Sequence, residues 1–146
     1  MPALQRERPA EGIEIVRLDR PEARNALDSA AIAELLDALA SLAADPELRV
    51  LVLSTTSTRA FCAGADVSEQ LDRAGGVERM ESFARLYAAL DAFPAPVVCV
   101  CVGNCVGAGA ELVAGSDLRV GGDFFNGYPI DSRRSPVRLH APPCCH

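Results

Sequence analysis

Two short apolar runs, RVLVLS at Arg49–Ser54 and VVCVCV at Val97–Val102, constrain the fold of this chain more than any other feature. Runs of this length and composition are typical of strands buried on both faces of a parallel sheet. A loop of small residues follows each run, AFCAGAD at Ala60–Asp66 and GNCVGAGAEL at Gly103–Leu112. The carboxyl ends of parallel strands usually form the ligand-binding edge of an open α/β sheet. We therefore expect the two loops to form the functional site.

The remaining segments alternate between strand and helix patterns. Glu11–Asp19 alternates apolar and polar residues through Ile13 and Ile15, which predicts a half-buried strand. Apolar residues at helical spacing predict helices over Ser29–Ala44 and Val77–Phe93. This order predicts an α/β fold with largely parallel strand pairing. Other expected features are loops at Thr55–Ala65 and Gly103–Gly109, short helices at Asp66–Arg73 and Ala110–Ala114, a break at Gly75–Gly76, a strand starting at Leu118–Val120, and a buried helical stripe of Met80, Phe83, Leu86, Tyr87 and Leu90.

Length and charge limit the class of protein. A chain of 146 residues with 49% apolar residues suits one domain with a hydrophobic core. The net charge of −6 argues against a nucleic-acid-binding protein, which usually presents a basic face. No apolar run approaches the ~20 residues of a membrane span, and Met1–Ala10 lacks the features of a signal peptide. We expect a soluble cytoplasmic protein with a polar N-terminal segment (1–10), a core (11–130) and an atypical tail (131–146).

The six cysteines fall into two groups. The first four lie in apolar or glycine-rich surroundings, where a free cysteine behaves as a small hydrophobic residue, and we expect no disulfide framework. The last two are adjacent in the tail segment, Asp131–His146, which also holds both histidines. Adjacent cysteines do not fit the usual C-x₂-C zinc geometry, so we expect no metal site, and the tail composition predicts disorder. The first group comprises Cys62, Cys99, Cys101 and Cys105, and the second Cys144 and Cys145.

A helix is expected to begin at or just after each of the two loops. The first N–H groups of a helix lack intrahelical acceptors and lie at the positive end of the helix dipole. Two such groups that converge on one point would form an oxyanion hole. A structural alternative remains, because glycine-rich turns between a strand and a helix often serve only close packing. The second loop lacks both the GxGxxG order of a dinucleotide-binding fold and the GK[ST] ending of a phosphate-binding loop.

Three motifs in order resemble the crotonase superfamily of enoyl-CoA hydratases and isomerases. They are RLDRPEARNAL (Arg17–Leu27), RAFCAGADVSE (Arg59–Glu69) and GNCVGAGAELVAGSDLRV (Gly103–Val120), and the resemblance covers roughly residues 11–130. It implies a crotonase-like spiral of β-β-α units, truncated before the C-terminal helical trimerisation region. It also implies an acyl-CoA thioester as substrate, no separate cofactor because coenzyme A is part of the substrate, and a parent family of trimers or hexamers.

The same resemblance implies roles for individual residues. Ala65 and Ala108 would supply the two backbone N–H groups of the oxyanion hole. Glu111 matches the first catalytic carboxylate of the family's hydratases, although a glutamate near the start of a helix also stabilises the helix dipole. The residues implied to contact coenzyme A or the thioester are Ala23, Arg24, Ala26, Ala63, Asp66 and Val67, and a guanidinium such as that of Arg24 suits a phosphate group.

The chain departs from the family at the second catalytic glutamate. The corresponding stretch is NGYPID (Asn126–Asp131), in which Ile130 occupies the glutamate position and Asp131 follows one residue later. This difference favours enolate chemistry such as isomerisation or C–C cleavage over two-carboxylate hydration. The tail resembles no part of the family. A shifted reading frame or a degraded gene copy would explain such a tail on a well-matched core. Two functions stay open: an acyl-CoA enzyme of the hydratase/isomerase type, and an inactive fragment that at most binds acyl-CoA or a full-length paralogue.

Overall fold

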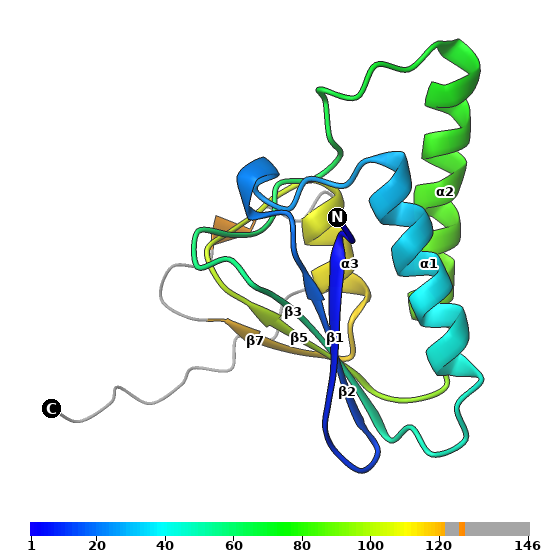
Figure 1. Cartoon of the computed structure of the whole chain (residues 1–146), viewed down its shortest axis with the longest axis vertical. Coiled ribbons are helices and arrows are strands. Elements are labelled where there is room, and N and C mark those ends of the chain that lie inside the picture. The colour runs from blue at the N-terminus through cyan, green and yellow to red at the C-terminus, as the bar shows by residue number, and fades with distance from the viewer. Residues whose placement is uncertain (122–125, 128–146) are drawn as a thin grey trace, which may run out of the picture.

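The chain winds through repeated units of two strands and one helix. The structure is a computed structural model, and it describes residues 1–121 and 126–127 (Figure 1). A 3-10 helix, η1 (Pro21–Ala23), precedes α1. The first unit comprises β1 (Leu4–Ala10), β2 (Ile13–Leu18) and α1 (Ser29–Ala43), and the second comprises β3 (Val50–Thr55), β4 (Ala60–Cys62) and α2 (Arg73–Asp91). The third unit comprises β5 (Val97–Cys101), β6 (Asn104–Cys105) and α3 (Ala108–Gly115). Two further strands follow, β7 (Leu118–Gly121) and β8 (Asn126–Gly127).

The strands form two sheets, and successive units of the spiral contribute strands to both. The large sheet has the order β1-β2-β3-β5-β7, and the small sheet has the order β4-β6-β8. All strand pairs are parallel except the β1–β2 hairpin. From β3 onward, the first strand of each unit joins the large sheet and the second strand joins the small sheet. This arrangement confirms the predicted α/β class and the predicted spiral of β-β-α units.

Helices α1 and α2 lie side by side over one face of the large sheet (Figure 1). Helix α1 begins at Ser29 because the Asp28 carboxylate accepts a hydrogen bond from the Ala31 N–H at 2.8 Å. Burial of each large aliphatic side chain contributes about 1.5–3 kcal/mol. The core between α1 and the sheet includes Ile32, Leu35, Leu39 and Leu42 of α1 and Val16, Leu51, Leu53 and Cys99 of the strands.

The half-buried strand predicted at Glu11–Asp19 forms as β2. Ile13 and Ile15 are half-buried, whereas Glu14 and Val16 lie on the buried side. Both faces of this sheet carry apolar residues, so alternation alone did not identify the inner face. A carboxylate is tolerated on the buried side because two arginines of β1 neutralise it, with Nε of Arg6 at 2.8 Å and Nε of Arg8 at 3.0 Å.

The sequence patterns did not predict β1, β4 and β6, which are short or polar strands. The polar N-terminal segment contains β1, an edge strand that the β2 ladder holds and whose residues are mostly exposed. Strands β4 and β6 lie inside the two segments that were expected to be loops, and they pair with each other. They comprise only three and two residues, too few to show a period of two.

The segment before α2 also differs from the prediction. No helix forms at Asp66–Arg73, and α2 starts at Arg73 with Asp72 as its cap, accepting from the Gly75 N–H at 2.7 Å. Gly75–Gly76 therefore lies in the first turn of α2 and does not break it. Met80, predicted to be buried, is 66% exposed. Among the helices of the described residues, none is both long and apolar enough to cross a membrane.

Candidate active site

The two predicted loops meet where β4 and β6 end. Cys62 pairs with Cys105 across these strands, and the Val106 N–H donates to the Cys62 carbonyl at 3.1 Å. A Cβ added to Gly107 would lie 3.6 Å from the Gly64 Cα, so the two loop backbones are in van der Waals contact. Both glycines have positive φ, +90° and +55°, which other residues adopt only with strain.

Ala65 and Ala108 directly follow these two glycines. Ala65 forms a parallel bridge with Leu27, whose N–H donates to the Gly64 carbonyl at 2.8 Å. Ala108 is the first residue of α3, where a backbone N–H has no intrahelical acceptor. Within residues 1–121 and 126–127, neither the Ala65 N–H nor the Ala108 N–H donates a hydrogen bond. The loops therefore present two available backbone donors close to each other.

Glu111 lies in the first turn of α3 and is half-buried. Tyr87 comes from α2, the helix that packs on α3. Burial, followed by the electrostatic effects of the Glu111 carboxylate and the Cys62 thiol, raises the pKa of Tyr87 to about 12. The carboxylate that was predicted to be catalytic thus lies within electrostatic range of a phenol that stays protonated at neutral pH.

The connector before α1 is held by a buried amide that the sequence analysis did not identify. Asn25 is 1% exposed, and its Oδ1 accepts from the Arg20 N–H at 2.7 Å. Its Nδ2 donates to Thr55 Oγ1 at 2.6 Å and to the Ala60 carbonyl at 3.1 Å. Asn25 also has a φ of 55°, a conformation that asparagine tolerates better than most residues. The signal available in the sequence was an asparagine within the ARNAL string, between Arg24 and Ala26.

The residues implied to contact coenzyme A lie on two neighbouring segments. The Ala63 N–H donates to the Arg24 carbonyl at 3.1 Å, which places the two segments side by side. Ala23 is half-buried, Ala26 is buried, and the Arg24 side chain is exposed. Arg24 makes no ion pair within the described part of the chain. The guanidinium is therefore accessible to an anionic group.

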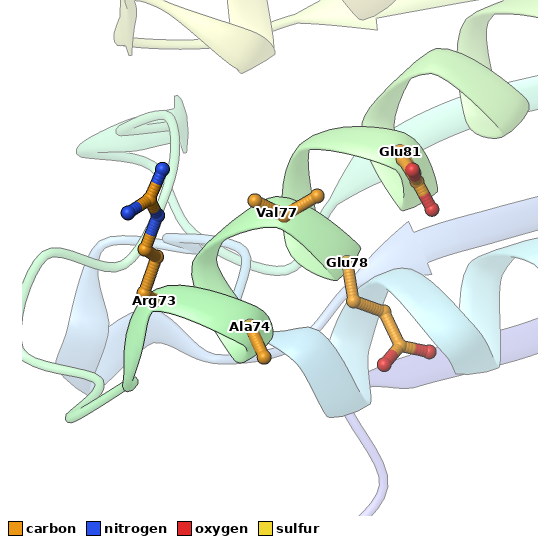
Figure 2. Close-up of a pocket in the computed structure, with 5 residues that line it drawn as sticks. All are labelled: Arg73, Ala74, Val77, Glu78 and Glu81. Atoms are coloured by element: carbon orange, nitrogen blue, oxygen red, sulfur yellow. The ribbon is translucent and has the colours of Figure 1, made fainter.

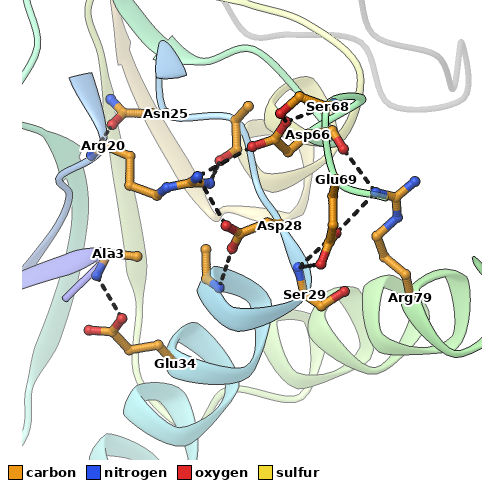
Figure 3. A network of polar contacts seen from close by, with 12 residues as sticks. Ala3, Arg20, Asn25, Asp28, Ser29, Glu34, Asp66, Ser68, Glu69 and Arg79 are labelled. Atoms are coloured by element: carbon orange, nitrogen blue, oxygen red, sulfur yellow. Dashed lines mark hydrogen bonds and ion pairs between the residues drawn. The ribbon is translucent and has the colours of Figure 1, made fainter. Parts of the chain in front are cut away.

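Asp66 and Val67 differ from each other in environment. The Asp66 carboxylate is buried and accepts hydrogen bonds from the Ser68 N–H at 3.0 Å and the Ser68 hydroxyl at 2.6 Å (Figure 3). The Ser68 hydroxyl contributes most to a lowered pKa of Asp66, and an ion pair with Arg20 at 3.3 Å adds to it. Val67 is 93% exposed. The Asp66 carboxylate thus uses its hydrogen bonds and its ion pair to stabilise the loop, whereas the Val67 side chain is exposed to solvent.

A polar network ties the loop after Ala65 to two helices (Figure 3). The Glu69 carboxylate accepts from the Ser29 N–H at 3.1 Å, at the start of α1. Arg79 of α2 pairs with Glu69 at 3.2 Å and donates to the Asp66 carbonyl at 2.9 Å. These contacts hold the segment that carries the Ala65 N–H against both helix N-termini.

Two hollows on the described part of the chain contain no candidate site residue. The hollow in Figure 2 is lined by residues of α2 alone, and none of them is a candidate site residue. No group of three or more metal-ligating side chains exists in residues 1–121 and 126–127. Cys62, Cys99, Cys101 and Cys105 are buried, as their apolar surroundings predicted, and their thiols are free. Ile130, Asp131 and the tail lie outside the described residues.

The sequence of the chain is similar to those of known proteins. The sequence profile of enoyl-CoA hydratase/isomerase matches residues 8–124. The mitochondrial enoyl-CoA hydratase domain-containing protein 2 of Bos taurus is 39% identical over 114 residues, which are 77% of this chain and 38% of that protein. The 2,3-dehydroadipyl-CoA hydratase of Escherichia coli is 35% identical over 109 residues, which are 75% of this chain and 42% of that protein.

Solved structures agree with the sequence comparison. An enoyl-CoA hydratase from Mycobacterium smegmatis superposes with a TM-score of 0.78 at 35% identity, over 83% of this chain and 48% of that one. The chain thus spans about two fifths of the curated relatives' length and about half of the solved structure. The match to the family profile covers most of the chain, and the fold repeats the β-β-α spiral. The chain therefore belongs to the enoyl-CoA hydratase/isomerase family.

Proposed function

We propose that this chain binds an acyl-CoA thioester and stabilises its enolate, the chemistry of the hydratase/isomerase type. The observation that carries the proposal is the pair of backbone N–H groups at Ala65 and Ala108. They lie on loops in direct contact, and they are free of protein acceptors in the described part of the chain. A thioester oxygen placed between them would accept two hydrogen bonds, which strengthen as the oxygen gains negative charge.

Glu111 would supply the acid/base group of this site. It lies one helical turn from Ala108 on α3, so the carboxylate and the second N–H donor come from the same rigid element. Proton transfer by a positioned carboxylate contributes roughly 10²–10⁴-fold to an enzymatic rate. A single carboxylate suits removal and return of a proton next to the thioester carbonyl, as in isomerisation.

Coenzyme A would lie along the two neighbouring segments, 23–26 and 63–67. The small side chains of Ala23, Ala26 and Ala63 leave room for pantetheine. The exposed guanidinium of Arg24 suits a phosphate of the nucleotide end. In this proposal coenzyme A enters as part of the substrate, and the reaction uses no further cofactor.

Acetoacetyl-CoA tests the ligand assignment, because its enolate absorbs in the near ultraviolet. We expect binding by calorimetry together with growth of the enolate band. Ala108→Pro removes the second donor, and proline is tolerated at the first position of a helix, so α3 should survive. Ala108→Gly is the matched control because it keeps the N–H. A folded chain that shows no affinity at millimolar ligand would refute the assignment, and equal enolate bands in both variants would refute the role of the Ala108 N–H.

A second proposal is that the chain binds acyl-CoA without turnover, alone or as a partner of a full-length paralogue. One observation favours it: the apolar Ile130 at the position of the second glutamate. Two absorbance assays distinguish the two proposals: hydration removes the conjugated absorbance of crotonyl-CoA, and isomerisation creates that absorbance from a 3-enoyl-CoA. Stoichiometric binding with no absorbance change in either assay supports the non-catalytic chain. Elution as a trimer or hexamer in size-exclusion chromatography favours an assembled enzyme.

A further inference from the structure

Tyr87 of α2 and Glu111 of α3 occupy matching turns of two packed helices. Leu90 of α2 lies against Gly115 of α3, where an added Cβ would come within 3.9 Å of the leucine. Tyr87 precedes Leu90 by three residues and Glu111 precedes Gly115 by four, so each lies one turn earlier on the same helix face. The electrostatic effect of Glu111 on the Tyr87 phenol agrees with this placement.

The phenol ring is held in place, whereas its hydroxyl has no protein partner. The Tyr87 ring stacks on Phe83 with ring centroids 6.0 Å apart and an interplanar angle of 22°. Neither the Tyr87 hydroxyl nor the Glu111 carboxylate forms a hydrogen bond with another residue of the described ranges 1–121 and 126–127. Half-buried polar groups on matching turns of two packed helices, with no protein partners of their own, are suited to sharing a small polar ligand.

We propose that Tyr87 and Glu111 hold one water molecule between them, with the phenol donating to the water oxygen and the water donating to the carboxylate. Tyr87 then acts as a positioning residue for the acid/base group. This inference rests on the proposed function in one respect, the acid/base role of Glu111. The phenol of α2 then holds the water, a task for which this sequence has no second glutamate because Ile130 occupies that position.

The chemistry of the phenol supports donation. Burial, the Glu111 carboxylate and the Cys62 thiol raise the pKa of Tyr87 to about 12, so the hydroxyl keeps its proton at neutral pH. A protonated phenol offers one O–H donor, and an ionised carboxylate only accepts. A water molecule between them satisfies both groups and fixes the direction in which the carboxylate takes up a proton.

A spectroscopic experiment tests the pairing without any acyl-CoA. The chain contains two tyrosines, so Tyr128→Phe leaves Tyr87 as the only tyrosine for ¹³Cζ labelling. We expect the Tyr87 ¹³Cζ resonance to depend on pH through the charge of the Glu111 carboxylate. Glu111→Gln should abolish this dependence, and Glu81→Gln, on the same helix as Tyr87, should retain it. An unchanged titration curve in the Glu111→Gln chain overturns the proposal.

A kinetic experiment tests the positioning role. Tyr87→Phe keeps the ring and its stacking on Phe83 but removes the hydroxyl. We expect kcat for crotonyl-CoA to fall about 10-fold or more while KM changes little, since the lost contact acts on the proton-transferring group. Equal kcat in the variant and the parent chain overturns the role. If the parent chain shows no turnover, the catalytic form of the proposed function fails, and the resonance experiment alone decides the Tyr87–Glu111 pairing.

Discussion

The backbones of Gly64 and Gly107 touch, with the Cα of one lying 3.6 Å from the position that a Cβ would take on the other. This contact sets the separation between the Ala65 and Ala108 N–H groups, because each alanine follows one of the glycines. An added Cβ at Gly64 would lie 3.2 Å from the Val106 carbonyl oxygen and would press the loops apart, whereas one at Gly107 would make only an ordinary contact at 3.6 Å. Both positions have a positive φ that favours glycine, so the site depends on the two glycines as much as on any functional group.

The first prediction concerns Gly64. Gly64→Ala adds a Cβ 3.2 Å from the Val106 carbonyl oxygen at a φ of +90°, so we expect destabilisation of about 1–3 kcal/mol. Gly76→Ala is the matched control, because nothing lies within 4 Å of its added Cβ and it is helical. That control should stabilise the chain by about 0.5–1 kcal/mol. Urea unfolding measures both, and a Gly64→Ala chain as stable as the parent would contradict the close approach.

Asn25 provides the second prediction. Asn25→Ala leaves the Arg20 N–H without its acceptor and the Ala60 carbonyl without the amide donor. We expect a loss of about 1–3 kcal/mol in the free energy of unfolding, since buried polar groups lose their partners. Asn104→Ala removes an exposed amide and should change stability by less than about 0.5 kcal/mol. Chemical denaturation compares the two, and equal effects would argue against the buried network.

A third prediction follows from the lowered pKa of Asp66. A carboxyl whose pKa is lower in the folded chain than the ordinary 3.8 stabilises the fold at pH values above 3.8. This contribution disappears as the pH falls below 3.8 through the lower folded value. Ser68→Ala removes the largest cause of the shift, so we expect the variant to lose less stability on acidification than the parent does. Thermal melts between neutral pH and the acid limit of folding measure it, and parallel curves would contradict the assignment.

The fourth prediction concerns the Cys62 thiol beneath the site. Burial raises its pKa from 9.0 to about 11, and only the thiolate reacts with alkylating reagents. The thiolate fraction near pH 8 is therefore roughly 100-fold smaller than for an ordinary cysteine, before exposure is considered. Mass spectrometry of iodoacetamide-treated protein should find the Cys62 peptide alkylated only after denaturation. Rapid native alkylation of Cys62 would show that the loop opens.

The sequence by itself determined the elements whose residues follow a local period. The strands β3 and β5, the helix α1 and the position of the two site loops all follow from apolar runs, helical spacing and small residues. These features are local, because a strand or helix that buries one face must repeat its apolar residues at a fixed interval. The order of the three motifs likewise indicated the family.

Only the tertiary structure decided the features that depend on distant segments. β1 is a strand because β2 pairs with it, and β4 and β6 are strands because they pair with each other. The inner face of β2 carries Glu14 because arginines of another strand neutralise it. Tyr87 lies 24 positions before Glu111 in sequence, and only the packing of α2 on α3 brings the two residues onto neighbouring helices. No local period encodes such contacts, because they arise from hydrogen-bond ladders and side-chain packing between parts of the chain that folding brings together.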